Sequence, residues 1–165
     1  MIKFEKAKGF GNRDVQLPIR ATKDSNGYDF VSNEDIVIPS FLDAIKTNEL
    51  INNGSQPALK DIKGLKPVLV STGVTATFPK DVVLLILNRS SNPIKRGLVL
   101  SNSVGDIDSG YYPNEIKGMF YNFSNHDYVI HKGDKIMQGI FQQFLLTDND
   151  QADGKRNGGF GSTGD

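Results

Sequence analysis

Short apolar segments separated by turn residues dominate the hydrophobic pattern of the chain. Between scattered glycines and prolines lie runs that are apolar throughout or alternate with polar positions, which is typical of strands. These runs predict strands at 15–19, 35–38, 68–70, 74–78, 82–87, 98–100, 119–123, 128–130 and 136–146. Val74–Phe78 alternates strictly, and His131–Asp134 is a turn signal between the last two strands. Many short strands with frequent turns predict an all-β sandwich or barrel.

One segment departs from this pattern and predicts a short helix. Ser40 stands directly before FLDAIKTNELIN, and Asp43 follows Ser40 by three residues. A serine with an acidic residue at that spacing marks a helix start, and Asn53-Gly54 supplies a plausible stop. We therefore expect a single short helix here within an otherwise β-rich chain.

Composition narrows the function classes. The chain has 165 residues, no cysteine, and 19 basic residues against 19 acidic ones, so its formal charge is zero. This length predicts one domain, and the balanced charge argues against a nucleic-acid partner or an anionic membrane surface. The lack of cysteine excludes disulfides, thiolate metal sites and a cysteine nucleophile. Because no apolar run is long enough for a membrane span or a leader, we expect a cytoplasmic protein without a membrane partner.

The segment 148–165 is polar and rich in glycine, with Phe160 as its one large apolar residue. Such a segment buries too little to fold alone and predicts a flexible arm. Its letters at 159–164 match GxGxxG, but a dinucleotide fold needs a strand before that motif and a helix after it. The glycine amides, hydroxyls and nearby cations could instead surround a phosphate, with Phe160 stacked on a base. The alternative is an ordinary disordered tail.

Two further clusters suggest phosphate chemistry. Arg89, Ser90 and Ser91 follow an apolar strand, and an arginine with two hydroxyls at a strand end suits a phosphate, although serine also favours an ordinary strand exit. Asp106 and Asp108 would share one face of a strand. A carboxylate near phosphate-binding groups can act as a general base for water. The alternative is a turn at the second aspartate that needs no chemistry.

Taken in order, these pieces resemble the trimeric dUTPase family. The resemblance rests on five short blocks that reach from residue 25 almost to the end of the sequence, of which the third and fifth are the most specific. They are Ser25–Phe30 (SNGYDF), Arg89–Ser91 (RSS), Asn102–Tyr111 (NSVGDIDSGY), Gly133–Gln138 (GDKIMQ) and Arg156–Gly164 (RNGGFGSTG).

The resemblance implies a jelly-roll-like all-β subunit that forms a homotrimer with shared active sites. The β domain would span 1–147, with a helical or loop insertion at about 40–66. The segment 148–165 would be the arm that closes a neighbouring subunit's active site. The implied reaction converts dUTP and water to dUMP and pyrophosphate with Mg²⁺.

Roles around the nucleoside follow from the resemblance position by position. Asp108 would activate the water that attacks the α-phosphorus. Tyr111 would lie against the deoxyribose and exclude a 2′-hydroxyl. Uracil would be recognised by Asn102, Gly105, Asp106 and Ile107. Since an extra residue follows this block, the choice between Tyr111 and Tyr112 stays open.

The resemblance also implies the residues around the phosphates. Asp29 would sit near the magnesium through its waters. The phosphates would be held by Arg89, Ser90, Ser91 and Gln138. The arm would bind the substrate through Arg156, Phe160, Gly161, Ser162 and Thr163, with Phe160 over the base. Lys155 has the family's usual spacing to the glycine pair, whereas Arg156 has the better chemistry, so both remain candidates.

Two alternatives remain beside this interpretation. A dCTP deaminase has a related fold and a similar third block, but it usually lacks the closing glycine arm. A regulatory module on the same fold could use the 40–66 insertion as a surface for an unidentified protein partner. The intact third and fifth blocks favour the hydrolase.

Overall fold

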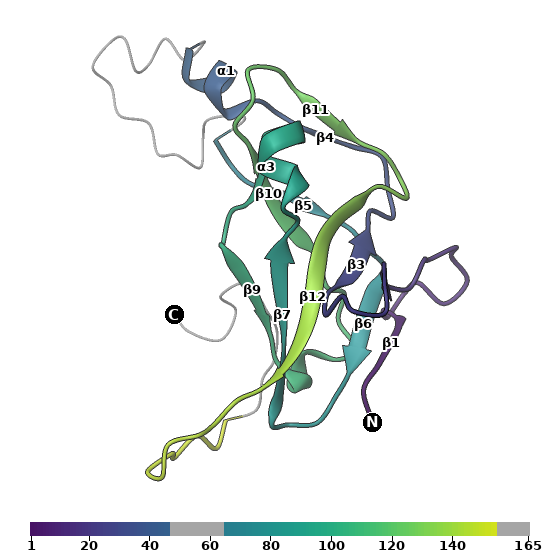
Figure 1. The fold of residues 1–165 in the computed structure, drawn as a ribbon, viewed down its shortest axis with the longest axis vertical. Helices are drawn as coiled ribbons and strands as arrows, with labels where there is room; N and C mark the ends of the chain where they lie inside the picture. The colour runs from purple at the N-terminus through teal and green to yellow at the C-terminus, as the bar shows by residue number, and fades with distance from the viewer. Residues whose placement is uncertain (47–64, 155–165) are drawn as a thin grey trace.

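A computed structural model of the chain describes residues 1–46 and 65–154, which are mostly β (Figure 1). The described residues contain two short α-helices, α1 (Phe41–Lys46) and α3 (Ser91–Arg96), and a 3-10 turn at Ser109–Tyr111. The strands are β1 (Lys3–Lys6), β2 (Ile19–Arg20), β3 (Tyr28–Val31), β4 (Ile36–Ile38), β5 (Val68–Val70), β6 (Val74–Thr77), β7 (Val82–Asn88), β8 (Leu98–Leu100), β9 (Val104–Ile107), β10 (Gly118–Asn122), β11 (Tyr128–Ile130) and β12 (Lys135–Gln143). The all-β prediction is confirmed.

The largest sheet has the strand order β2-β3-β12-β7-β9, and every neighbouring pair in it is antiparallel. A second sheet has the order β5-β10-β8, and the pairs β1-β6 and β11-β4 complete the framework. Figure 1 shows the long strand β12 running beside β7 and β3 through the middle of the molecule. Since β12 pairs with both neighbours, it fixes where their polar ends lie.

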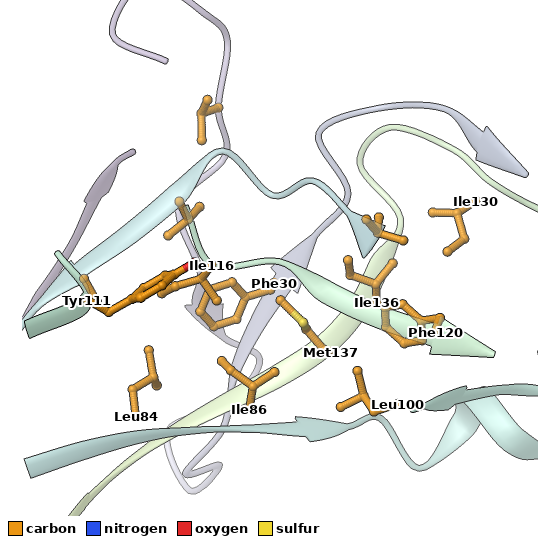
Figure 2. Packing of buried hydrophobic residues seen from close by; sticks show 14 of the residues in the cluster. Phe30, Leu84, Ile86, Leu100, Tyr111, Ile116, Phe120, Ile130, Ile136 and Met137 are labelled. Carbon is orange, nitrogen blue, oxygen red and sulfur yellow. The ribbon is translucent and has the colours of Figure 1, made fainter. Parts of the chain in front are cut away.

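The core lies between the five-stranded and three-stranded sheets. Phe30 of β3, Leu84 and Ile86 of β7 and Met137 of β12 are buried with Phe120 of β10 (Figure 2). Buried side chains alternate with half-buried ones along β7, as the period of two along a strand requires, although all of these residues before Asn88 are apolar. The inner face of the five-stranded sheet is therefore apolar. Its other face carries the apolar side chains of β7 at 83, 85 and 87, and Leu87 pairs there with Gln138, which in turn pairs with Asp29.

Most predicted strands are present, and the exceptions have physical reasons. The segment 15–19 contributes only β2, because Val15 enters the core from a loop rather than from a strand. The run 136–146 ends at Gln143 in the sheet, although its last three residues are apolar. The hydrophobic pattern did not predict strands β1, β3 and β9 or helix α3, because each is short and carries polar residues inside its run.

The two predicted local signals at 40–43 and 131–134 are confirmed. The Ser40 hydroxyl accepts a hydrogen bond from the backbone N–H of Asp43 at 2.9 Å, so it caps the first turn of α1. The backbone N–H of Asp134 donates to the His131 carbonyl at 2.9 Å, and Gly133 supplies the required positive φ of 91°. The expected stop at Asn53-Gly54 lies outside the described residues. None of the helices in the described ranges is long and apolar enough to span a bilayer.

Candidate active site

Three strands bring together, at Asp29, several of the residues that the sequence predicts around the phosphates. The Asp29 side chain on β3 is only 2% exposed. Its Oδ1 accepts a hydrogen bond from Gln138 Nε2 on β12 at 3.1 Å and lies 3.3 Å from Arg89 Nε, just beyond the end of β7. Its Oδ2 accepts a hydrogen bond from Lys135 Nζ at 2.7 Å. Asp29, Arg89 and Gln138, separate in the sequence, therefore form one cluster, to which the structure adds Lys135.

A β-bulge on β12 makes this cluster possible. In a regular strand, Lys135 and Gln138 would point to opposite faces, because they are three residues apart. The pairing of β12 with β3 shifts between Lys135 and Met137, so that Lys135 lies opposite Val31 and Gln138 lies opposite Asp29. One extra residue in the strand thus places both polar side chains on the face that carries Asp29. Lys135 belongs to the fourth block, but no local pattern in that block indicated this contact.

Gly27 allows the first and fourth blocks to approach closely. A Cβ atom at Gly27 would lie 3.3 Å from Cδ of Gln138, which is tighter than ordinary packing. The glycine of the first block therefore leaves room for the Gln138 side chain beside Asp29.

The cluster keeps Asp29 ionised. Burial raises the pKa of the Asp29 carboxyl, but the hydrogen bonds from Lys135 and Gln138 and the charge of Arg89 outweigh burial. The pKa therefore lies below its ordinary value, and the carboxylate is charged at neutral pH. Two cations and one anion leave the cluster with a net charge of +1. An excess of positive charge suits a phosphate ligand.

Helix α3 holds the second block against β12. The Asn92 side chain is fully buried, and its Nδ2 donates to Asn88 Oδ1 at 2.8 Å and to the Ile136 carbonyl at 2.7 Å. Asn88 is thus part of the anchor. Ser90 is exposed, and its hydroxyl does not cap the helix that follows. The helix therefore anchors the second block, whose Arg89 contacts Asp29.

The third block forms β9 and the turn after it. Asn102 lies in the turn before β9, and its Nδ2 would be 3.7 Å from a Cβ atom at Gly105. Asp106 is exposed on the strand, and Ile107 is half-buried. The Asp108 carbonyl accepts a hydrogen bond from the Tyr111 N–H at 3.0 Å, so the expected turn is present at the end of the strand. The block places Asn102 and Asp108 at opposite ends of one edge strand.

The two tyrosines of the third block have different surroundings. Tyr111 is 9% exposed and belongs to the core, whereas Tyr112 is 48% exposed. The Tyr111 hydroxyl donates to the Glu115 carbonyl at 3.0 Å. Burial, and then the charge of Glu115, raise the pKa of Tyr111, so its hydroxyl remains a donor at neutral pH. Tyr111 is therefore fixed in position, whereas Tyr112 is largely open to solvent.

Glu115 is a second residue that sequence reasoning missed. Its Oε1 accepts hydrogen bonds from the Ser71 hydroxyl and from the N–H groups of Thr72 (3.1 Å) and Gly73 (2.8 Å). These bonds tie the segment after Tyr111 to the loop between β5 and β6. An acidic residue shortly after the third block was the available signal.

Asp108 does not join the Asp29 cluster within one chain. Ile107, its neighbour, pairs with Leu84 near the start of β7, while Arg89 follows the last residue of that strand. The five steps along the chain from Leu84 to Arg89 span about 17 Å, at roughly 3.3 Å per residue. Within a single chain, the expected general base Asp108 therefore lies far from the expected phosphate ligand Arg89. The expected arm residues Arg156, Phe160, Gly161, Ser162 and Thr163, with Lys155, lie outside the described residues.

The surroundings of Asp29 do not form a metal centre. The described ranges contain no group of three or more His, Asp or Glu side chains that could hold a metal ion. Both Asp29 oxygens already accept donors from Gln138 and Lys135, with Arg89 beside them. Magnesium prefers several oxygen ligands and keeps its waters. Direct coordination at Asp29 therefore does not fit this arrangement.

Comparisons with known proteins agree on one family. The family model described as dUTPase matches residues 58–164. The deoxyuridine 5'-triphosphate nucleotidohydrolase of Lactococcus lactis is 39% identical over 168 aligned residues, which cover 98% of this chain and 96% of the relative.

Solved structures give the same result. The crystal structure of a dUTPase from Streptococcus mutans has a TM-score of 0.69 and 33% identity, covering 88% of this chain and 98% of that one. A dUTPase variant from phage phi11 of S. aureus, described with a structural Mg(II) ion, has a TM-score of 0.64 and 19% identity over 93% of this chain and 97% of its own. The last match supports the fold alone. The family model and the Lactococcus relative decide the assignment: this chain belongs to the dUTPase family.

Proposed function

We propose that this dUTPase hydrolyses dUTP to dUMP and pyrophosphate by attack of a water, activated by Asp108, on the α-phosphorus. The observation that carries the proposal is the convergence of Arg89, Gln138 and Lys135 on Asp29, because it gathers cationic and amide donors on the outer face of the main sheet. Hydrolysis of a triphosphate depends mainly on positioning and charge stabilisation. The cluster therefore supplies cationic and amide donors of the kind that hydrolysis of a triphosphate needs.

In the proposed mechanism, Arg89, Ser90, Ser91 and Gln138 hold phosphate oxygens and keep the α-phosphorus in line with the water. Asp108 accepts a proton from that water as it attacks. The bond from the α-phosphorus to the bridging oxygen breaks, and pyrophosphate leaves with the electron pair. The charge of the departing pyrophosphate is stabilised by the guanidinium and by the arm, through Arg156 or Lys155.

Recognition of the nucleoside is assigned to the third block. Asn102 and the backbone of Gly105, Asp106 and Ile107 face a nucleobase along the edge strand β9. The ring of Tyr111 lies against C2′ and leaves no room for a 2′-hydroxyl. Phe160 of the arm covers the base, and Gly161, Ser162 and Thr163 complete the phosphate contacts. The fixed position of Tyr111 supports this assignment.

We also propose a homotrimer in which each active site takes residues from more than one subunit. The separation of Asp108 from Arg89 along β7 supports sharing, because both must act on one short triphosphate. Exposed apolar residues after β12 support assembly, since Leu145 is 96% and Leu146 69% exposed in one chain. Residues of this type are usually buried, and a neighbouring copy would cover them.

Magnesium remains part of the proposal as a companion of the substrate. When bound, it would neutralise triphosphate charge, and substrate oxygens rather than protein carboxylates would supply most of its ligands. Contact of Asp29 with the ion through water stays a prediction from the sequence, as do a cytoplasmic location and the lack of nucleic-acid and membrane partners. No step of the mechanism above depends on Asp29 holding the ion.

A pyrophosphate-release assay with dUTP, dTTP, dCTP and UTP tests the proposal. We expect release from dUTP and little or none from the other three nucleotides. Ammonia release from dCTP would instead favour the deaminase alternative. Activity on none of the four nucleotides would contradict the proposed function and leave a binding role for this chain.

A further inference from the structure

In the cluster at Asp29, a buried carboxylate is surrounded by donors that are more exposed to solvent than it is. One buried carboxylate contacts a lysine and a glutamine from one strand, β12, and an arginine from the end of another, β7. The carboxylate itself is 2% exposed, whereas the side chains of Arg89 and Lys135 are 23% and 41% exposed. The anion therefore lies beneath its cations, and the cations, not Asp29, face the solvent.

The Arg89 guanidinium contacts oxygen atoms through two of its nitrogens. Its Nε lies 3.3 Å from Asp29 Oδ1, and its Nη1 donates to the Lys135 carbonyl at 3.3 Å. The same carbonyl accepts a bond from Arg96 Nη1 at 3.0 Å. A guanidinium held at two of its nitrogens has fewer orientations to lose when a phosphate binds to it.

We propose that Asp29 is a positioning residue that orients Arg89, Gln138 and Lys135 for the phosphates of the substrate, independently of any metal ion. This inference rests on the proposed function. Asp29 does not touch the substrate in this role. It neutralises one of two neighbouring cations, so that both can stay close together, and its two oxygens set the directions of the side chains above it.

This role and the net charge of the site predict opposite changes in anion affinity when the charge of Asp29 is removed. Removing a negative charge from a phosphate site should strengthen anion binding if charge alone matters. Removing an orienting carboxylate should weaken it, because the two cations repel each other and lose their fixed directions. A role of Asp29 only through magnesium predicts no change when metal is absent. Without metal, the three explanations therefore predict stronger, weaker and unchanged binding of an anion when the charge of Asp29 is removed.

The experiment measures binding of inorganic pyrophosphate to the full chain by calorimetry, in EDTA, for the wild type and Asp29→Asn. We expect the variant to bind pyrophosphate about tenfold more weakly or worse, the change that about 1.4 kcal/mol produces. Asp14→Asn is the matched control, because the Asp14 side chain is 95% exposed, and it should bind like the wild type. Binding by Asp29→Asn that is equal to or tighter than wild type would overturn the inference, and so would a wild type that binds no pyrophosphate.

Two more variants keep the test decisive. If Asp29→Asn does not fold, Asp29→Glu keeps the charge but displaces the carboxylate by one methylene group. Positioning predicts weaker pyrophosphate binding by Asp29→Glu, and unchanged binding would overturn it. Because Asp29 acts partly through Arg89, the loss of binding in the double variant Asp29→Asn/Arg89→Ala should be smaller than the sum of the losses in the two single variants. Additive losses would contradict this. Failure of the proposed function is distinguishable, since it appears as a wild type that cleaves no dUTP.

Discussion

The hydroxyl of Tyr111 donates a hydrogen bond to the backbone carbonyl of Glu115 at 3.0 Å, across the bend that follows β9. The Glu115 side chain in turn binds the loop at Ser71, Thr72 and Gly73. The ring that we assign to sugar discrimination is thus held by the core on one side and by a carboxylate-anchored segment on the other. Its position is set by parts of the chain that lie far apart in the sequence.

The first prediction concerns the two tyrosines. Tyr111→Leu keeps an apolar side chain in the core but removes the ring, so cleavage of UTP relative to dUTP should rise by about tenfold or more. Tyr112→Leu, at an exposed position, should leave that ratio unchanged. The measurement is kcat/KM for both nucleotides. If the Tyr112 variant changes the ratio and the Tyr111 variant does not, the exposed tyrosine is the residue that contacts the sugar.

Glu115 should be important for stability. Glu115→Ala leaves the N–H groups of Thr72 and Gly73 without their acceptor, so the free energy of unfolding should fall by about 2–4 kcal/mol. Glu115→Gln keeps an oxygen acceptor and should lose much less. Lys117→Ala, which removes only an exposed ion-pair partner of Glu115, is the control. Denaturant unfolding measures all three, and an alanine variant as stable as wild type would show that the loop does not need this carboxylate.

Asp108 should be needed for turnover rather than for binding. Asp108→Asn preserves the shape of the side chain but cannot take a proton from water, so kcat should fall by about 10²–10⁴. The affinity for a non-hydrolysable dUTP analogue, measured by calorimetry, should stay near the wild-type value. If the variant turned over dUTP at a rate comparable to the wild type, Asp108 would have only a structural role in the turn after β9.

Shared sites predict recovery of activity from two inactive variants. Asp108→Asn and Arg89→Ala should each be nearly inactive alone. Mixed trimers formed from equal amounts should regain about a quarter of wild-type activity, if each site takes Asp108 from one subunit and Arg89 from its neighbour. Mass spectrometry can verify that the mixed trimers form. No recovery in verified mixtures would mean that both residues serve the same site from one chain.

Removal of the arm should separate folding from catalysis. Truncation after Gly154 should leave the unfolding midpoint and oligomer size unchanged, because residues 155–165 contain one large apolar side chain. Turnover should fall sharply, since the proposed phosphate contacts of the arm are lost. Lys155→Ala and Arg156→Ala, compared by kcat, decide which cation binds phosphate, and we expect the larger loss for Arg156 because its planar fork binds in two places. Full activity of the truncated chain would contradict an active arm.

The sequence by itself determined the class of fold and the identity of most candidate residues. Short apolar runs between turn residues are a local property, so they predicted β4 to β8 and β11 close to their observed bounds. The Ser40 cap was readable for the same reason, because its bond to Asp43 spans three residues. The five blocks supplied the family resemblance, since their order and letters need no coordinates.

Only the tertiary structure decided how those residues meet. Lys135 and Gln138 reach Asp29 together because of a bulge on β12, and a bulge depends on the pairing with β3 rather than on the letters of β12. Helix α3 is stable because Asn92 bonds to Asn88 and to the Ile136 carbonyl on a distant strand. The distance between Asp108 and Arg89 likewise follows from the register of β9 on β7. Strand register and buried polar contacts join residues far apart in the chain, and local sequence pattern carries no direct record of them.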